Sequence, residues 1–233
     1  MDICPIKAFS DNYIWVIEEG TEAVIVDPGE AKGVIGYLAE KNLELKAILL
    51  THNHDDHIGG VQEILVTYPD ISIYGPEETS SLANHVVVEG DSFNLLNEQF
   101  NVIKTAGHTE GHISFLAKKI LFCGDALFSA GCGRVFTKDY QAQYDALQKF
   151  NQLDDEVLVY AAHEYTQTNL RFSQGIEPPN KVISEALAKT NELRAKGQPT
   201  LPTTIGREKK INLFLQATSL EDFKELRQAR DHF

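Results

Sequence analysis

Cysteine, basic residues and long apolar runs are all scarce in this chain of 233 residues. Its three cysteines, Cys4, Cys123 and Cys132, are odd in number and widely spaced, which does not indicate a disulfide framework. Lys and Arg total 21 against 34 Asp and Glu, so the net charge is −13. This balance excludes an extended nucleic-acid surface, because phosphate binding needs clustered basic residues. A small anionic substrate remains compatible, since a local pair of arginines could bind it.

The apolar stretches are all shorter than the roughly 18–20 residues that span a bilayer. The N-terminus also lacks the charged-then-apolar layout of a signal peptide. We therefore expect a soluble protein of the reducing cytoplasm with neither a membrane nor a nucleic-acid partner. Apolar residues make up 42% of the chain, enough for a substantial core, and the length suits one large domain or a domain with an appendage.

Strand and helix signals alternate through most of the chain. Short β-rich runs at 13–17 and 23–26 are separated by a hairpin signal, and 47–50 is a continuous apolar run typical of a strand buried on both faces. Further strands are predicted at 71–74, 86–88, 100–104, 113–117, 120–123 and 157–161. Helices are predicted at 31–41, 60–68, after Pro76 and across 140–150. This alternation predicts an α/β (α+β) protein, with sheets covered by helices.

The character of the sequence changes after His163, where strand signals vanish. Residues 181–196 and 219–233 both predict helices. Ser219 with Asp222 resembles a capping box, and Leu220, Phe223 and Leu226 mark the buried face of the last helix. We predict a catalytic domain at 1–165 and a small helical domain at 166–233.

Residues 51–57 read Thr-His-Asn-His-Asp-Asp-His and follow the buried strand. In an extended segment, residues two apart point the same way, so His52 and His54 can address one ion together. If the chain then turns into a helix, Asp56 and His57 point elsewhere and can hold a second ion. A solvated polar loop is the alternative, but so many ligand types in one short stretch make it improbable.

Three more candidate ligands follow strands or lie in a glycine-bounded turn: His108, Asp125 and His163. Each alone is weak, because a single histidine after a strand is usually structural. Together with the first motif they suit two metals that share a carboxylate, and Asp125 is the natural bridge because it has two oxygens. A water between two such ions becomes a hydroxide nucleophile near neutral pH. We expect two divalent ions, zinc in the first place, with iron or manganese compatible with the same ligands.

The order and spacing of these seven residues resemble the metallo-β-lactamase superfamily over about the first 165 residues. The resemblance implies an αββα sandwich with the metals at the edge where the two sheets meet. It implies the following ligand sets: His52, His54 and His108 for one metal, Asp56, His57 and His163 for the other, and Asp125 for both.

Three segments of the later chain look like the glyoxalase II (hydroxyacylglutathione hydrolase) family: 131–134, 162–166 and the arginine motif at 227–233. This resemblance implies hydrolysis of S-2-hydroxyacylglutathione thioesters, for example S-D-lactoylglutathione to glutathione and D-lactate, the second step of methylglyoxal detoxification. The expected nucleophile is the metal-bridging hydroxide, with Asp56 and Asp125 as the catalytic carboxylates and no serine or cysteine nucleophile.

The predicted substrate contacts suit a ligand with a carboxylate at each end. Arg227 and Arg230 lie three apart on a helix, hence on one face, and could clamp a carboxylate. The alternative is a solvated helix end, where the helix dipole favours arginine. Tyr165 offers a phenol, and Arg134 follows a glycine-rich loop. Phe136 stands where some family members carry Tyr, which removes one substrate hydrogen bond.

Several other polar residues and cysteines have subsidiary predicted roles. Asp27 could orient a ligand imidazole or form a turn beside Pro28. We expect His112 to be structural or to support a ligand, and Asp55 to be exposed. The remaining predictions are these: His85 and His232 on the surface, Cys123 in the core, Cys4 structural and Cys132 shaping the binding loop.

The main competing activity is a glutathione persulfide dioxygenase with a single iron on the same fold, which would not need the complete second ligand set. A β-lactamase would be expected to lack the terminal arginine motif, and a nuclease would need a basic groove. A structural zinc module would be Cys-rich, unlike this set. For the assembly we take a monomer as the expectation.

Overall fold

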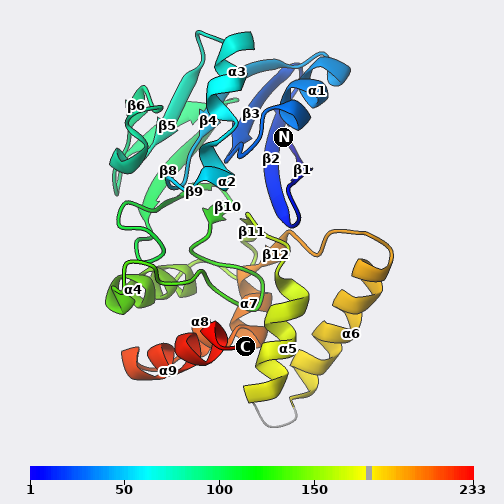
Figure 1. Cartoon of the computed structure of the whole chain (residues 1–233), viewed down its shortest axis with the longest axis vertical. Helices are drawn as coiled ribbons and strands as arrows, with labels where there is room; N and C mark the ends of the chain where they lie inside the picture. Colours follow the sequence, from blue (N-terminus) through cyan, green and yellow to red (C-terminus); the bar gives the residue numbers. More distant parts are fainter. Residues whose placement is uncertain (177–179) are drawn as a thin grey trace.

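The computed structural model describes residues 1–176 and 180–233. Two six-stranded sheets form its centre, with strand orders β1-β2-β3-β4-β5-β6 and β12-β11-β10-β9-β8-β7 (Figure 1). The first sheet contains β1 (Asp2–Ala8), β2 (Asn12–Glu19), β3 (Glu22–Val26), β4 (Glu44–Leu49), β5 (Ser72–Gly75) and β6 (His85–Val86). The second contains β7 (Ser92–Leu95), β8 (Glu98–Lys104), β9 (Ile113–Ala117), β10 (Ile120–Gly124), β11 (Leu158–Ala161) and β12 (Thr203–Thr204).

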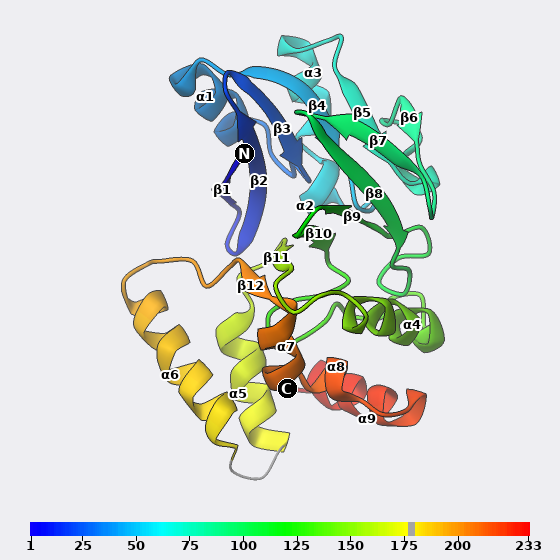
Figure 2. The same ribbon diagram turned by 180° about the vertical axis from the view of Figure 1, so that it is seen from behind.

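The helices fall into two groups; in both views α1 and α3 lie at one end of the molecule, and α5, α6 and α9 lie toward the other (Figures 1 and 2). The group beside the first sheet contains α1 (Lys32–Lys41), α2 (Asp55–Ile58), α3 (Val61–Thr67) and, nearby, the 3₁₀ turn η1 (Glu77–Thr79). The group beside the second sheet contains α4 (Tyr140–Asn151), α5 (Thr166–Ile176), α6 (Lys181–Ala195), α7 (Ile205–Ile211), α8 (Leu213–Gln216) and α9 (Leu220–Asp231). The arrangement is the predicted α/β sandwich with a helical C-terminal region.

Alternate residues of β2 enter different apolar layers. Trp15 and Ile17 join the core between the sheets with Phe100 and Phe115, whereas Ile14 and Val16 join a second core under α1 and α3. Because successive side chains of a strand point to opposite faces, only a strand covered on both sides shows this uninterrupted apolar sequence. A third, smaller cluster lies among the C-terminal helices.

The strands that precede the candidate ligands end at the same edge. β3, β4 and β5 are mutually parallel, and β10 is parallel to β11, so the carboxyl ends of β4, β10 and β11 come together where the sheets meet. His52 follows β4, Asp125 follows β10 and His163 follows β11. Rigid sheets therefore position all three ligand segments.

The structure corrects several of the sequence predictions. The expectation that strands stop after His163 is wrong, because Thr203 and Thr204 form β12 and pair with Val159 and Leu158. This pairing adds part of the helical region to the second sheet. The strand predicted at 86–88 is displaced to His85–Val86. Unpredicted elements are β1, β7, α2, α5, α7 and α8.

The predicted capping box of the last helix is half correct. Ser219 is the N-cap of α9, and its hydroxyl accepts a hydrogen bond from Asp222 N at 3.1 Å. The Asp222 carboxylate does not return to Ser219; it accepts from Thr218 N at 3.3 Å. Phe223 is fully buried, while Leu220 and Leu226 are only half-buried. Within the described residues, no helix is both long and apolar enough to cross a membrane.

Candidate metal centre

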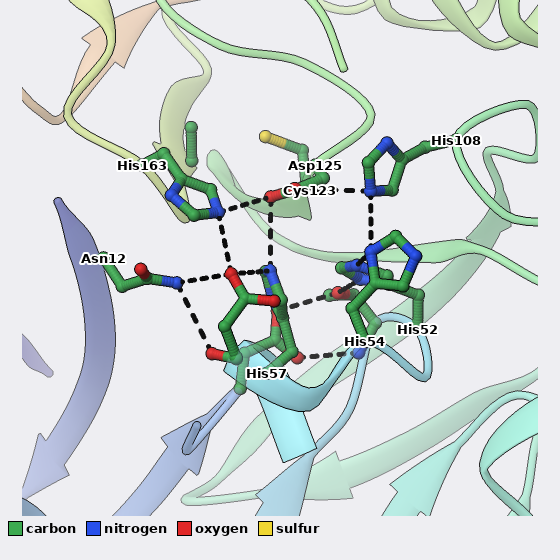
Figure 3. Close-up of polar contacts among 12 residues, drawn as sticks. Asn12, His52, His54, His57, His108, Cys123, Asp125 and His163 are labelled. Atoms are coloured by element: carbon green, nitrogen blue, oxygen red, sulfur yellow. Dashed lines mark hydrogen bonds and ion pairs between the residues drawn. The ribbon is translucent and has the colours of Figure 1, made fainter. Parts of the chain in front are cut away.

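Three histidines from two loops form the first ligand set. His54 Nδ1 lies 3.1 Å from His52 Nε2 and 3.0 Å from His108 Nε2 (Figure 3). His52 and His54 are in the short extended segment after β4, and His108 is in the turn between β8 and β9. The three ring nitrogens converge on one point, as the alternation of the extended segment predicts.

The second set lies beside the first and comes from α2 and the end of β11. The Asp56 carboxylate Oδ2 is 3.6 Å from His57 Nε2 and 3.4 Å from His163 Nε2. Because α2 begins at Asp55, immediately after His54, the chain turns and directs Asp56 and His57 away from the first set. Asp55 itself is exposed, as predicted.

Asp125 faces both sets with different oxygens. Its Oδ1 lies 3.4 Å from His57 Nε2 and 3.3 Å from His163 Nε2, whereas its Oδ2 lies 3.4 Å from His108 Nε2 (Figure 3). A carboxylate that presents one oxygen to each set has the placement of a bridging ligand. The His and Asp clusters therefore have the arrangement of a binuclear metal site.

The polar atoms inside the cluster support that assignment. Among the described residues, His57 Nε2 and Asp125 Oδ1 are buried and make no hydrogen bond. Orphaned buried polar atoms are rare in native proteins, because each loses its hydration without compensation. A divalent cation in each set would satisfy these atoms, and the N and O donors suit zinc, iron or manganese.

The two sets have different electrostatic surroundings. Burial lowers the pKa of His52 and of His108. Burial also opposes the charge on His57, but the carboxylates of Asp125 and Asp27 outweigh it and raise its pKa to about 10. His163 behaves likewise: against burial, Asp125, Asp56 and Asp11 raise its pKa to about 11. The second set is therefore the more anionic environment.

Four of the ligand histidines are held through their other ring nitrogen. Metal-binding histidines commonly need such partners, which set the tautomer and the ring orientation. The contacts are His52 Nδ1 with Thr51 Oγ1 at 3.0 Å, His57 Nδ1 with Asp27 Oδ2 at 3.1 Å, His108 Nδ1 with the Arg134 carbonyl at 2.8 Å, and His163 Nδ1 with Asp11 Oδ1 at 2.7 Å.

Asp27 performs both of the roles that the sequence left open. It lies in the turn after β3 with φ 51°. Its carboxylate accepts from Thr51 N at 2.8 Å and from Thr51 Oγ1 at 2.7 Å, as well as contacting His57. One buried carboxylate thus supports His57 directly and His52 through Thr51.

His112 has the predicted supporting role. It is fully buried, contacts Thr105 Oγ1 through Nδ1 at 2.9 Å, and its Nε2 accepts from Asp125 N at 3.2 Å. Gly124, which immediately precedes Asp125, has φ 46°, and a Cβ there would lie 2.3 Å from Thr51 Oγ1. Glycine is needed at this position so that β10 can deliver Asp125 between the two sets.

The remaining histidines and cysteines agree with their predictions in most respects. His85 and His232 are exposed, although the His85 ring stacks on Tyr74 with centroids 4.6 Å apart. Cys123 is buried in the core, and Cys4 is half-buried. All three cysteines are unpaired.

A cleft of about 450 Å³ lies over the metal centre and contains every predicted substrate contact: Arg134, Phe136, Tyr165, Arg227 and Arg230. Phe136 is 58% exposed and points its ring edge-on to His54 and His108, with centroids 5.6 and 5.3 Å away. Tyr165 stacks on the His163 ring at 4.7 Å. Burial raises the pKa of the Tyr165 phenol, so the phenol stays protonated and able to donate.

The two arginines of α9 are not equivalent. Arg227 is only 4% exposed and donates to the Cys132 carbonyl at 2.8 Å and to Asp231 Oδ1 at 2.9 Å. Arg230 is half-buried and donates through Nε to Asn169 Oδ1 at 3.2 Å. A solvated helix end is therefore the wrong interpretation for Arg227. Its bond to Cys132 also fits the predicted role of that residue in shaping the loop.

Arg134 faces the cleft from the loop that follows β10. Its guanidinium is exposed and donates through Nε to Asp231 Oδ1 at 3.1 Å. The preceding Gly133 lies against the metal centre: a Cβ there would come within 2.1 Å of the Asp125 carbonyl and 2.8 Å of His108 Nδ1. The glycine allows the loop to approach the ligands closely enough for the Arg134 carbonyl to hold His108.

Sequence reasoning missed two residues at the start of the chain, Asp11 and Asn12. Asp11 contacts His163, and Asn12 Nδ2 donates to Asp56 Oδ2 at 2.9 Å. Neither residue is part of a ligand motif, and both are remote in sequence from the residues they contact, so no local signal marked them. It also missed Asn169, which lines the cleft from α5.

Comparisons with known proteins agree with this geometry. The profile of the metallo-beta-lactamase superfamily matches residues 9–163, and that of the hydroxyacylglutathione hydrolase C-terminus matches residues 164–233. The chain belongs to the metallo-β-lactamase superfamily. Two similar proteins named hydroxyacylglutathione hydrolase, from Haemophilus ducreyi and Glaesserella parasuis, are 53% and 52% identical to it over the full length of both chains.

A solved structure from the same superfamily has a closely similar fold. The crystal structure of ETHE1 from Myxococcus xanthus superposes with a TM-score of 0.75 at 27% identity, covering 98% of this chain and 90% of that one. The C-terminal match distinguishes the chain from superfamily members that have only the metal-binding fold. The matched residues 164–233 also contribute to the cleft, through Tyr165, Asn169, Arg227 and Arg230.

Proposed function

We propose that the protein is a metal-dependent hydroxyacylglutathione hydrolase, cleaving S-2-hydroxyacylglutathione thioesters to glutathione and a 2-hydroxy acid. S-D-lactoylglutathione, which yields D-lactate in the detoxification of methylglyoxal, is the substrate we favour. The observation that carries this proposal is the joining of two features in one cleft. Five of the seven candidate metal ligands line its floor, and arginines from the C-terminal region line its wall. Full-length relatives that carry the hydrolase name support it.

Two divalent ions, when bound, lower the pKa of a water between them and polarise a thioester carbonyl. The chain contributes the geometry of that chemistry. Asp125 spans the two ligand sets, and Asp56 is held toward His163 by Asn12. We assign to these two carboxylates the orientation of the reacting water. Phe136 and Tyr165 flank the floor of the cleft.

Substrate recognition is proposed for the arginine-rich wall. Glutathione carries two carboxylates, and a guanidinium binds a carboxylate through parallel hydrogen bonds. Arg134 and Arg230 each use Nε within the protein, to Asp231 and Asn169 respectively. We assign their terminal nitrogens to the substrate. Arg227, with its bond to the Cys132 carbonyl, supports the wall and completes the clamp; Tyr165 donates to the peptide backbone of the substrate.

We also propose that metal binding resides in residues 1–165 and glutathione recognition in 166–233, with Arg134 and Phe136 reaching across from the first part. The two parts share the second sheet through β11 and β12, so each cleft wall is fixed relative to the other.

Zinc is the metal we favour, iron or manganese being compatible with the same donors. Free cysteines support a reducing, cytoplasmic setting. We take the active form to be a monomer.

The competing reaction is oxygenation of a glutathione persulfide at one iron. Such chemistry needs a single ligand set, whereas Asp56, His57 and His163 form a second one here. The deciding experiment is to measure hydrolysis of S-D-lactoylglutathione and metal content on the same purified sample. Thioester hydrolysis with close to two metals per chain supports the proposal. No hydrolysis, one iron per chain and oxygen uptake with a persulfide would reject it.

A further inference from the structure

Residues 9–13 comprise the turn between β1 and β2 (9–11) and the first two residues of β2; they contact the second ligand set and are called the N-terminal turn below. Asp11 Oδ1 lies 2.7 Å from His163 Nδ1. Asn12, only 6% exposed, donates through Nδ2 to Asp56 Oδ2 at 2.9 Å and reaches the Asp56 carbonyl at 3.4 Å (Figure 3). Two of the three ligands that belong to the second set alone are therefore held by adjacent residues of one turn.

The N-terminal turn is bound along its length to the segment that carries His163. Tyr13 N donates to the Ala162 carbonyl at 2.7 Å, and Glu164 N donates to the Asp11 carbonyl at 2.8 Å. The Tyr13 hydroxyl adds a side-chain bond to Glu164 Oε2 at 2.7 Å. This short antiparallel pairing aligns Asp11 with His163 and leaves little freedom to either.

One residue of the N-terminal turn, Phe9, has an unfavourable backbone conformation. Phe9 has φ 49°, a left-handed conformation that bulky residues rarely adopt, and its side chain is 58% exposed. Burial of the side chain therefore does not explain the conformation. The Phe9 ring lies against Gly29, where an added Cβ would come within 2.8 Å of it. Such strain persists only where surrounding structure over-determines the conformation.

The first ligand set has different supports. His52 is held by Thr51, and His108 by the Arg134 carbonyl. Among the contacts of the described residues, none joins the side chains of Asp11 or Asn12 to His52, His54 or His108. A change in the N-terminal turn should therefore act on one half of the metal centre and spare the other.

We propose that Asp11 and Asn12 are positioning residues that set the metal affinity of the Asp56, His57 and His163 set independently of the His52, His54 and His108 set. Asp11 fixes the tautomer and orientation of His163, so that Nε2 faces the second ion. Asn12 fixes the rotamer of Asp56, so that Oδ2 faces the same ion. The inference rests on the proposed function only in that both need a binuclear centre.

The test is titration of metal-free, full-length protein with zinc, followed by calorimetry and by metal content after dialysis against graded chelator. Wild type should bind two ions. Asp11→Ala should weaken binding of one ion by roughly 10–100-fold, the usual effect of removing a partner of a ligand histidine, while the other ion binds as before. Asn12→Leu, similar in size, should act in the same direction.

Two further variants separate positioning from charge and from general destabilisation. Asp11→Asn keeps an oxygen acceptor for His163 Nδ1, so it should retain most of the second-ion affinity that Asp11→Ala loses. Asp55→Asn removes one charge from an exposed residue in the same ligand segment and should leave both affinities unchanged. If Asp11→Ala fails to fold, Asn12→Leu and Tyr13→Phe carry the test, the latter with a smaller effect on the same ion.

Equal weakening of both ions in Asp11→Ala and Asn12→Leu, or unchanged affinity for both, would overturn the proposal. Loss of affinity in Asp11→Asn equal to that in Asp11→Ala would show that charge, and not orientation, is responsible. Failure of the proposed function looks different: wild type would bind two zinc ions with the predicted selectivity among variants yet leave S-D-lactoylglutathione intact.

Discussion

The two halves of the metal centre share Asp125 but are built in different ways. In the first, the ring supports are neutral: a threonine hydroxyl behind His52 and a backbone carbonyl behind His108. In the second, carboxylates stand behind the histidines, Asp27 for His57 and Asp11 for His163. The candidate ligands differ in the same way: besides Asp125, the first half has three histidines, whereas the second half has two histidines and the carboxylate of Asp56. The pKa of His52 and His108 is lowered, whereas that of His57 and His163 is raised.

This difference shows that two adjacent sites need not be equal in strength or in what controls them. A carboxylate behind an imidazole raises the basicity of the ligand, whereas a neutral acceptor mainly orients the ring. The second site therefore depends on charged partners from two turns remote in sequence. The first depends on the position of the loop that carries Arg134.

Replacing the shared candidate ligand should have the largest effect, because Asp125 faces both ligand sets directly. Asp125→Ala should lower kcat for S-D-lactoylglutathione on the order of a thousandfold or more, reflecting several kcal/mol of lost stabilisation. It should also weaken binding of both ions. Steady-state kinetics with metal analysis on one sample tests this, and a variant with normal activity or with only one affected site would contradict the bridging role.

Replacing Asp27, whose carboxylate supports histidines of both halves, should have the second-largest effect. Asp27→Ala deletes a buried carboxylate that contacts Thr51 and His57, leaving their donors unpaired. We expect about 3 kcal/mol of lost unfolding free energy in the metal-free protein and weaker binding of both ions. Denaturant unfolding and zinc titration measure these effects. Selective loss at one ion, as expected for Asp11→Ala, would show that Thr51 does not carry the influence of Asp27 to His52.

The 128–134 loop, whose Arg134 carbonyl supports His108, is itself held by the buried residue Glu208. Glu208 on α7 is fully buried and accepts hydrogen bonds from Ser129 Oγ at 2.8 Å, Ala130 N at 2.6 Å and Thr203 Oγ1 at 2.7 Å. It thereby ties the start of the 128–134 loop to the helical region. Glu208→Gln keeps the shape but places an amide donor against these donors.

We expect Glu208→Gln to cost about 2 kcal/mol of unfolding free energy. A moderate loss of affinity should follow at the ion held by His108, because the Arg134 carbonyl belongs to the same loop. Thermal unfolding and zinc titration test both effects. Exposed Glu185→Gln on α6 is the matched control and should change neither quantity. Weakening at the second ion alone would contradict the division between the halves.

Substitutions of the arginines that line the cleft, Arg227 and Arg230, should have the smallest effect on the metal centre. Arg230→Ala should raise KM for S-D-lactoylglutathione by roughly 10-fold, corresponding to about 1.4 kcal/mol, with little change in kcat or metal content. Arg227→Ala should raise KM as well but also destabilise the protein, because its guanidinium is buried against Cys132. An unchanged KM in Arg230→Ala would remove that residue from the carboxylate clamp.

The clustering of the candidate ligands could be predicted because its signal is local. Within 51–57 the two-residue alternation of an extended segment, followed by a helix, already separates His52 and His54 from Asp56 and His57. The buried strands before His52, Asp125 and His163 were equally visible, since continuous apolar runs between turn residues mark covered strands. The family resemblance implied what spacing could not, an assignment of each candidate ligand to one of two metals.

The supports of those ligands depended on contacts between remote segments. Asp11 meets His163 and Asn12 meets Asp56 only because β2 lies beside the end of β11 in the folded sandwich. The sequence pairs Arg227 with Arg230 as a carboxylate clamp, but it does not reveal that α9 packs Arg227 against the Cys132 loop. β12 is too short for its sequence to reveal a strand, and pairing with β11 alone creates it. A motif records which side chains can bind an ion; burial, tautomer and orientation follow from neighbours that the chain acquires only on folding.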